Sequence, residues 1–314
     1  METPDMPRGK ERRSIPRTIT PLNGVPAVDS ATSPRFPLKQ PQLEALVRAA
    51  LEEDCAFNDI TTIATIISDR RSRATLTARQ NGVISGVPLA LEAFRLLDSN
   101  GTIRVEHEDG SAVKAGEPVV FMTGSPRGLL SAERVALNYV QRLSGIATLT
   151  AKYVERVKHT KAKILDTRKT TPGWRALEKY AVRCGGGMNH RMDLASAVLI
   201  KDNHLAAVDG DIATAVSRAR ELAPPGTKVE VECDRLEQVR AAVEARADII
   251  LLDNMSTETL RAAVDEVAGA AILEASGGVN LDTVRAIAET GVDWISVGAL
   301  THSAPAMDLA LDFD

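Results

Sequence analysis

The sequence predicts an α/β protein in which a barrel of parallel strands follows a smaller α+β domain. Between residues 160 and 303, short apolar segments alternate with amphipathic segments, as strands buried on both faces alternate with the helices that cover them. No GxGxxG motif follows the first strand, so a closed barrel is favoured over an open dinucleotide-binding sheet. The predicted strands are 163–166, 197–201, 228–233, 248–253, 271–275 and 293–297, and the predicted helices are 175–183, 211–222, 235–245, 257–267 and 280–290.

Residues 38 to about 150 lack this regular alternation. Helical spacing of apolar residues predicts helices over 40–53 and 87–98, and strands are expected over 73–79, 103–106 and 118–123. Strands grouped beside helices in this way indicate an α+β sandwich. We expect a polar break over 54–62, and a long helix over 131–158 that is broken or kinked at Ser144-Gly145.

The first 37 residues are set apart by seven prolines and by the absence of apolar periodicity, so we expect a disordered extension. The extension also lacks the apolar core of a secretory signal.

Composition limits the function classes. The chain has 314 residues, 44% of them hydrophobic, and a formal net charge of -4. It has no long basic run and no apolar run near the ~20 residues that cross a bilayer, so neither nucleic acid nor a membrane is an expected partner. The three cysteines are dispersed, which indicates a reducing compartment and, in our interpretation, the cytoplasm.

Charged residues and glycines stand at the carboxyl ends of the predicted strands, where barrels of this kind hold their sites. The segment 163–204 holds eight Lys or Arg against four Asp or Glu, although the whole chain is acidic. A solvated basic face would explain the cations alone, and a helix N-cap would explain any one aspartate. The coincidence at six strand ends favours a binding site for anions.

Three kinds of residue divide the chemistry of this site. Glycine loops after the last two strands suit a phosphate monoester, acidic residues suit sugar hydroxyls or a divalent cation, and cationic residues suit carboxylates and a pyrophosphate. The glycine-loop residues are Ser276, Gly277, Gly278, Gly298 and Ala299; the acidic residues are Glu232 and Asp253; the cationic residues are Arg168, Lys169, His190, Arg191 and Lys201.

At these residues the sequence resembles the quinolinate phosphoribosyltransferase family. The resemblance covers roughly residues 40–312 and leaves out the proline-rich start. The matching segments, in the family's order, are ERVALNYVQRLSGIATLT, ILDTRKTTPGWRALEKYAVRCGGGMNHR, LIKDNH, VEVE, ILLDN, EASGG and VGALTHS.

The resemblance implies that quinolinate and phosphoribosyl pyrophosphate react to give nicotinate mononucleotide, pyrophosphate and carbon dioxide, with Mg²⁺, in NAD biosynthesis. It also implies the residue roles. Quinolinate would be held by Arg134, Arg168, His190, Arg191 and Lys201. Phosphoribosyl pyrophosphate would be bound by Lys169, Lys201, Glu232 and Asp253, which are also the catalytic residues, and by the glycine-loop residues. Glu232 and Asp253 are the expected Mg²⁺ ligands.

The family fold further implies a domain division and an assembly. We expect an N-terminal α/β sandwich over 38–137, joined by the C-terminal tail 304–314, and an open seven-stranded α/β barrel, TIM-like, over 138–303. We expect a homodimer in which Arg134 reaches the partner's site, and the resemblance leaves a hexamer open. From the residues alone, Arg134 reads as a surface cation on a helix.

Three other readings remain open on the sequence. A related phosphoribosyltransferase would take nicotinate or another acid, and would need fewer converging cations. A lyase or aldolase barrel would use Lys169 or Lys201 as a Schiff base. A non-catalytic protein would retain only the fold, which the full set of charged strand ends argues against.

Overall fold

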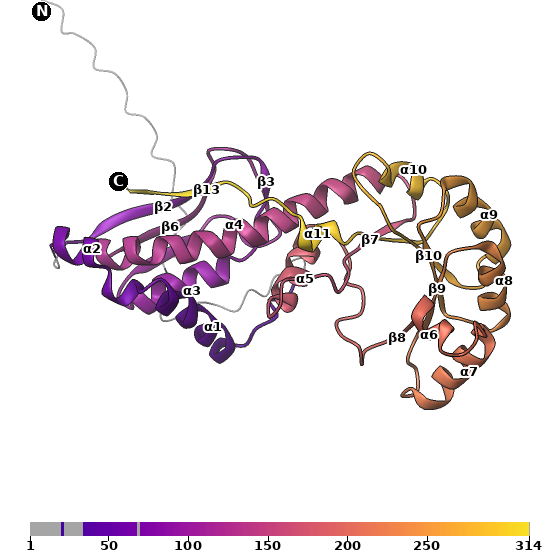
Figure 1. Cartoon of the computed structure of the whole chain (residues 1–314). Helices are drawn as coiled ribbons and strands as arrows, with labels where there is room; N and C mark the ends of the chain where they lie inside the picture. The colour runs from indigo at the N-terminus through magenta and orange to yellow at the C-terminus, as the bar shows by residue number, and fades with distance from the viewer. Residues whose placement is uncertain (1–19, 22–33, 68–69, 314) are drawn as a thin grey trace, which may run out of the picture.

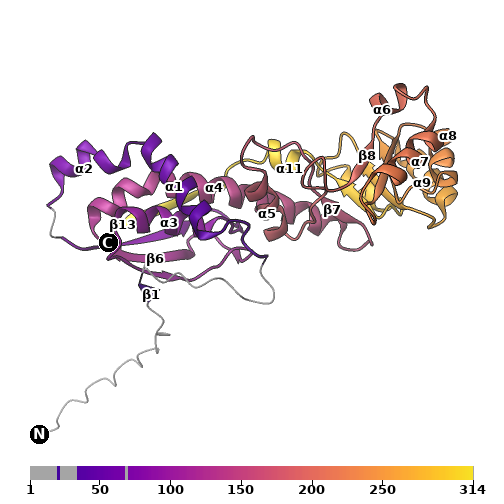
Figure 2. The same cartoon turned by 90° about the horizontal axis from the view of Figure 1, so that it is seen from below.

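The structure is a computed structural model that describes residues 20–21, 34–67 and 70–313 (Figure 1). A long helix, α4 (Pro126–Val157), runs from an N-terminal domain toward a C-terminal α/β domain, and the molecule is elongated along it (Figures 1 and 2). Most of the extension that we expected to be disordered, residues 1–37, lies outside the described residues. Within it, Thr20 and Pro21 pair with the N-terminal sheet, and Phe36 packs edge-on against Tyr180 at 5.3 Å.

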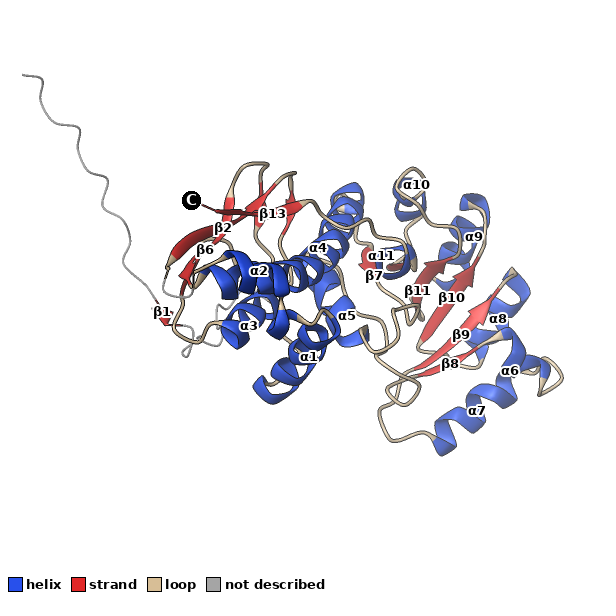
Figure 3. Cartoon of the chain, turned by 60° about the vertical axis from the view of Figure 1, so that its left-hand side comes forward, coloured by secondary structure: helices blue, strands red, loops and turns tan. Residues whose placement is uncertain are grey.

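The N-terminal domain is built on an antiparallel five-stranded sheet in the order β1-β4-β6-β2-β13. Its helices lie over one face of this sheet (Figure 3). The strands are β1 (Thr20–Pro21), β2 (Ser72–Ala78), β4 (Thr102–Val105), β6 (Pro118–Gly124) and β13 (Leu309–Phe313), with a separate pair β3 (Gly82–Val83) and β5 (Ala112–Val113). The helices are α1 (Gln40–Glu53), α2 (Ile60–Thr65), α3 (Val87–Leu97) and the first half of α4.

The expected polar break at 54–62 was wrong in part. It contains a 3₁₀ turn, Ala56–Asn58, and the start of α2. Asp59 caps this helix, because its side chain accepts a hydrogen bond of 3.0 Å from the Thr62 backbone N–H. The polar letters that read as a loop are therefore the cap of a short helix.

The C-terminal domain contains a six-stranded sheet in the order β7-β12-β11-β10-β9-β8, and every pair in it is parallel. All six strands lie where the sequence predicts them: β7 (Lys163–Leu165), β8 (Val198–Ile200), β9 (Val229–Cys233), β10 (Ile249–Asp253), β11 (Ile272–Ser276) and β12 (Trp294–Ser296). The helices are α5 (Arg175–Cys184), α6 (Asp202–Ala206), α7 (Ile212–Leu222), α8 (Leu236–Glu244), α9 (Thr257–Val267), α10 (Val284–Ala288) and α11 (Ala299–His302).

The helix predicted over 280–290 is shorter than expected. Asn280 forms a turn in which its side-chain oxygen accepts hydrogen bonds from the backbone N–H groups of Asp282 and Thr283. That local bonding delays the start of α10 to Val284, because Asn offers the backbone an alternative to helical hydrogen bonds.

The six strands do not close on themselves within the described residues, in contrast to the closed barrel that the alternation favours. The ladder ends at β7 on one side and β8 on the other. One further parallel bridge joins Leu165 of β7 to Met188, in the loop that leads toward β8.

Strand register separates a charged face of this sheet from an apolar one. Residues paired in register point to the same face, so Glu230 and Glu232 of β9 share a face with Asp253 of β10 and Glu274 of β11. The alternate residues on the other face are apolar and buried, and amphipathic helices cover them (Figure 3). They include Val229, Val231, Cys233, Ile250, Leu252, Leu273 and Ala275.

Helix α4 is unbroken, so the predicted break at Ser144-Gly145 was wrong. The glycine serves a close approach instead: a Cβ at Gly145 would lie 2.0 Å from the Pro305 carbonyl oxygen. The crossing chain is tied to α4 by a hydrogen bond of 2.9 Å from the Met307 N–H to the Gln141 carbonyl. Beyond this crossing, β13 adds to the N-terminal sheet beside β2.

In the described part of the chain, no helix combines the length and the apolar character that a membrane crossing requires.

Gly145→Ala is expected to destabilise the protein, although the same change inside an unhindered helix stabilises it by up to about 1 kcal/mol. The added methyl group meets the Pro305 carbonyl, and overpacking of this kind costs about 1–3 kcal/mol. Urea unfolding measures the difference, with Asn138→Ala at an exposed position of α4 as the control that loses no stability. A gain in stability for Gly145→Ala would contradict the close approach.

Candidate active site

The carboxyl ends of β8, β9 and β10 bring together a cation and two carboxylates predicted for the site. Lys201 follows β8, and its ammonium group forms an ion pair with Glu232 at the end of β9. Asp253 ends β10 on the same face, and its side chain accepts a hydrogen bond of 2.7 Å from the Asn254 amide. The Glu232 side chain is 14% exposed and the Lys201 side chain 44% exposed, so the pair lies at the edge of the interior with access to a ligand.

Two predicted arginines lie near each other at the mouth of the sheet. The Arg168 Nε atom is buried and has no hydrogen-bond partner among the described residues. Arg191 donates a hydrogen bond of 3.1 Å to the Ala197 carbonyl. Burial lowers the pKa of Arg191, and the positive charge of Arg168 lowers it further. Like charges held together, with one guanidinium nitrogen left without a partner, suit an anion that binds between them.

A buried ion pair holds the loop that carries His190 and Arg191. Lys179 of α5 pairs with Asp166, which follows β7, and neither side chain is more than 1% exposed. Asp166 also accepts a hydrogen bond of 2.9 Å from the His190 N–H, while the Lys179 ammonium donates one of 3.0 Å to the His190 carbonyl. Asn189 donates to Asp166 at 2.5 Å and to the Lys179 carbonyl at 2.8 Å. Burial raises the pKa of Asp166 and lowers that of Lys179, and their attraction opposes both shifts.

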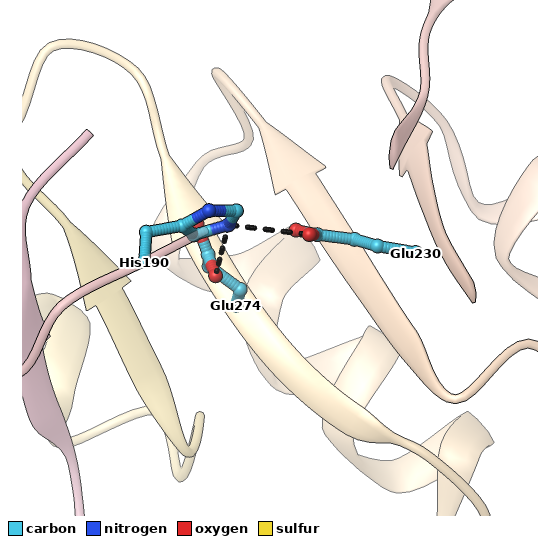
Figure 4. Close-up of side chains that lie close together, drawn as sticks. All are labelled: His190, Glu230 and Glu274. Atoms are coloured by element: carbon cyan, nitrogen blue, oxygen red, sulfur yellow. Dashed lines mark ion pairs between the residues drawn. The ribbon is translucent and has the colours of Figure 1, made fainter. Parts of the chain in front are cut away.

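The imidazole of His190 lies between two carboxylates on the charged face of the sheet, which we call its inner face (Figure 4). Its Nε2 atom is 3.2 Å from an oxygen of Glu230 and 3.4 Å from an oxygen of Glu274. Its Nδ1 atom accepts a hydrogen bond of 2.8 Å from the Arg191 N–H. Burial by itself would lower the pKa of His190, but the two carboxylates outweigh burial and raise it to about 10. Both ring nitrogens are thus engaged by the protein.

The predicted glycine loops follow β11 and β12. Gly277 has φ +92°, and a Cβ there would lie 2.1 Å from the Asn254 side-chain oxygen, so only glycine fits. Gly278 also has a positive φ, of +59°, and nothing lies within 4 Å of the position of its Cβ. Gly298, before Ala299 at the start of α11, leaves room for Lys169, whose Cδ would lie 3.1 Å from an added Cβ. These loops bring Lys169 close to backbone that a phosphate could approach.

Arg134 is the predicted site residue that the chain does not bring to the others. It is exposed on α4, and no hydrogen bond or ion pair within the described residues joins it to the strand ends.

Two groups of buried charges matter here that the sequence did not assign. Glu178 and Lys179 are adjacent on α5 and both fully buried, and Glu178 pairs with Arg142 of α4 at 2.7 Å. Glu230 and Glu274 are the second group. In the sequence, Glu178 and Lys179 are consecutive charges in an otherwise amphipathic helix, and Glu230 lies in the alternating segment VEVE of a buried strand. Neither pattern shows which residue pairs with the buried charge.

Comparisons with known proteins identify the family of this chain. The model of the family "Quinolinate phosphoribosyl transferase, C-terminal domain" matches residues 146–312, and that of the N-terminal domain matches residues 59–144. The nicotinate-nucleotide pyrophosphorylase [carboxylating] of Mycobacterium leprae is 46% identical over 274 residues, which cover 85% of this chain and 95% of that protein. A probable nicotinate-nucleotide pyrophosphorylase [carboxylating] of Bacillus subtilis is 42% identical, over 86% of this chain and 93% of that protein.

A solved structure of the nicotinate-nucleotide pyrophosphorylase from Francisella tularensis matches with a TM-score of 0.83 and 41% identity, over 90% of this chain and 100% of that chain. Fold and site therefore define a phosphoribosyl-transferring enzyme of the α/β class. The chain belongs to the quinolinate phosphoribosyl transferase family. The resemblance read from the sequence is confirmed.

Lys179→Met is expected to cost about 3–5 kcal/mol of stability, because it leaves the Asp166 carboxylate buried without its counterion. The double variant Lys179→Met with Asp166→Asn should recover part of this loss, since the amide keeps hydrogen-bonding capacity without a charge. Urea unfolding of the single and double variants measures the coupling free energy between the Lys179 and Asp166 side chains. Lys161→Met, which breaks a solvent-exposed pair with Asp293, is the matched control and should cost little. A Lys179→Met variant as stable as this control would contradict the assignment.

Proposed function

We propose that this protein transfers the phosphoribosyl group of phosphoribosyl pyrophosphate to quinolinate, forming nicotinate mononucleotide, pyrophosphate and carbon dioxide in NAD biosynthesis. The observation that carries the proposal is the gathering of cations, carboxylates and glycine loops at the carboxyl ends of one parallel sheet, in a chain of this family. A dianionic acid and a pyrophosphate ester together call for such a set of charges.

Quinolinate binds at the mouth of the sheet, between Arg168, Arg191 and Lys201, with His190 behind them. The unpartnered Arg168 Nε supports this placement, since a guanidinium and a carboxylate form paired hydrogen bonds in one plane. Arg134 of the partner subunit completes the set.

Phosphoribosyl pyrophosphate binds across the neighbouring strand ends. Lys169 and Lys201 face the pyrophosphate, while Glu232 and Asp253 hold the ribose hydroxyls. The 5′-phosphate lies in the loops formed by Ser276, Gly277, Gly278, Gly298 and Ala299, whose exposed backbone N–H groups suit its oxygens.

Mg²⁺ fits the same carboxylates. Glu232 and Asp253 offer hard oxygen ligands from adjacent strands, and few protein ligands are typical where the ion also binds substrate phosphates. When bound, the ion supplies positive charge to the pyrophosphate.

The chain's own residues act mainly by position and charge. Lys169 and Lys201 stabilise the negative charge that develops on the departing pyrophosphate. The ribose becomes cationic as its bond to the pyrophosphate breaks. Glu232 or Asp253 stabilises this cation while the pyridine nitrogen of quinolinate attacks the ribose. The arginines then hold the pyridinium intermediate, whose ring cation stabilises the electron pair left on C2 as the 2-carboxylate leaves as carbon dioxide. That carbon then takes a proton from solvent to give nicotinate mononucleotide. Breaking the bond between the ring and the 2-carboxylate needs no general base. The orientation of the reactants therefore supplies most of the rate.

The proposal includes a homodimer and an open seven-stranded barrel. The parallel bridge between Met188 and Leu165 of β7 supports a seventh strand on that side of the sheet. Two exposed apolar groups support an interface: Ile60, Ile63 and Ile67 on and after α2, and Met192 and Leu194 next to Arg191. Helix α2 packs against α4, so the first group lies on the same domain as Arg134. A cytoplasmic location suits the three free thiols, Cys55, Cys184 and Cys233.

Arg168→Ala should lower kcat/KM for quinolinate by about 30- to 1000-fold, the loss of about 2–4 kcal/mol that a charged bidentate contact supplies. The KM for phosphoribosyl pyrophosphate should change little. The assay follows carbon dioxide and nicotinate mononucleotide, with and without Mg²⁺, and with nicotinate in place of quinolinate. Arg240→Ala, at an exposed ion pair on α8, is the control. Wild-type kinetics for Arg168→Ala, or turnover of nicotinate by the wild type, would reject the substrate assignment.

Mixing two inactive variants tests whether Arg134 crosses between subunits. Arg134→Ala and Lys201→Ala should each be inactive alone. After subunit exchange, half of the dimers are mixed, and each of these has one intact site, so about a quarter of wild-type activity should return. A mixture that stays inactive, or an Arg134→Ala variant with full activity, would rule out the shared site.

A further inference from the structure

Glu230 and Glu274 are buried carboxylates for which the proposed reaction has no direct use. They extend from β9 and β11, which flank β10, and both point to the inner face of the sheet. Their exposed fractions are 2% and 0%. Apart from the imidazole of His190, Glu230 Oε1 and both Glu274 oxygens have no hydrogen-bond partner among the described residues. Burying carboxylates that lack hydrogen-bond partners lowers the stability of the protein. Their presence here therefore indicates a functional role.

Every polar atom of His190 is held by the protein. Asp166 binds its N–H, Lys179 binds its carbonyl, and the Arg191 N–H binds Nδ1. The two glutamates pair with Nε2 (Figure 4). The ring therefore has no free nitrogen with which to bond quinolinate. Its position instead fixes the backbone of the next residue, Arg191, whose guanidinium is directed by a further bond to the Ala197 carbonyl.

The same three side chains have the composition of a metal site, and their ligand atoms lie within 4.8 Å of one another. The ring argues against a metal. A histidine that binds a metal through Nε2 carries its proton on Nδ1, but here Nδ1 receives the Arg191 N–H. The tautomer that fits all contacts has its proton on Nε2, directed at the carboxylates.

Burial raises the pKa of the Glu230 carboxyl and the negative charge of Glu274 raises it further, while the His190 ring opposes both effects.

We propose that Glu230 and Glu274 are positioning residues of the quinolinate site, which hold the His190 ring and, through its bond to the Arg191 N–H, orient the Arg191 guanidinium. This inference rests on the proposed function. It assigns Glu230 and Glu274 to substrate recognition although neither touches the substrate.

The test compares kinetic constants of substituted enzymes at neutral pH. Glu230→Ala and Glu274→Ala should each raise the KM for quinolinate about ten- to a hundredfold, as expected when a binding group is displaced by about 1 Å. The KM for phosphoribosyl pyrophosphate should stay within about threefold of wild type, since none of the residues assigned to it forms a hydrogen bond or ion pair with the His190 ring in the described chain. Glu274→Gln should restore most of the quinolinate affinity, because the amide oxygen still accepts from Nε2–H.

Glu92→Gln is the matched control. Glu92 is equally buried, but it pairs with Arg95 in the N-terminal domain. Its substitution should lower stability and leave both KM values unchanged. If an alanine variant does not fold, Glu274→Asp keeps the charge and withdraws it from the ring, and the quinolinate KM should rise.

Three results would overturn the inference. Unchanged quinolinate KM in Glu230→Ala or Glu274→Ala, or in Glu274→Asp where alanine does not fold, would show that the ring needs no such support. Equal losses for both substrates would indicate a general structural role. A stoichiometric metal in the purified wild-type protein, lost in Glu274→Gln, would make the cluster a metal centre. Failure of the proposed function is separate, since the wild-type enzyme would then release no carbon dioxide from quinolinate.

Discussion

The parallel register of β8 to β11 is the constraint on which the site depends. In β9, Val229, Val231 and Cys233 are fully buried on the face that the helices cover, and this fixes Glu230 and Glu232 on the opposite face. A slip of one residue would put the carboxylates under the helices and the valines into the site. Apolar packing on one face of the sheet therefore positions the charges on the other, and the chemistry of the inner face depends on the outer core.

Buried charges on the inner face of the sheet lower the stability of the protein. Ion pairs with residues of other elements limit this loss. Asp166 with Lys179, and His190 with Glu230 and Glu274, place charges inside the protein with partners from other elements. Arg168 lacks a partner of opposite charge in the described chain, and its buried Nε has no hydrogen bond there. In the proposed site, the paired charges hold the loops and Arg168, the incompletely satisfied cation, faces the quinolinate anion. The fold thus leaves a cation without a partner at the point where a bound substrate can provide one.

Local pattern was sufficient for the strands and for the gathering of residues at their ends, because burial on both faces leaves an apolar run that charge or glycine terminates. It failed where a distant segment decides. Gly145 reads as a helix break, yet it admits Pro305, which is 160 positions away in the chain. The partners of Lys179 and Glu274 were equally invisible, since no spacing states which buried charges meet. Arg134 lies beyond both approaches, because its proposed site is on another subunit.

Helix α4 connects these levels. Arg142 donates to Glu178 at 2.7 Å and to the Ala304 carbonyl at 3.1 Å, so α4 is tied to both α5 and the crossing C-terminal segment. Glu178 in turn accepts hydrogen bonds from the Thr171 N–H and hydroxyl. The loop that bears Arg168 and Lys169 is therefore anchored by Asp166 at one end and by Thr171 at the other. In the proposed dimer the same helix carries Arg134 to the partner, so a shift of α4 would displace cations in both sites together.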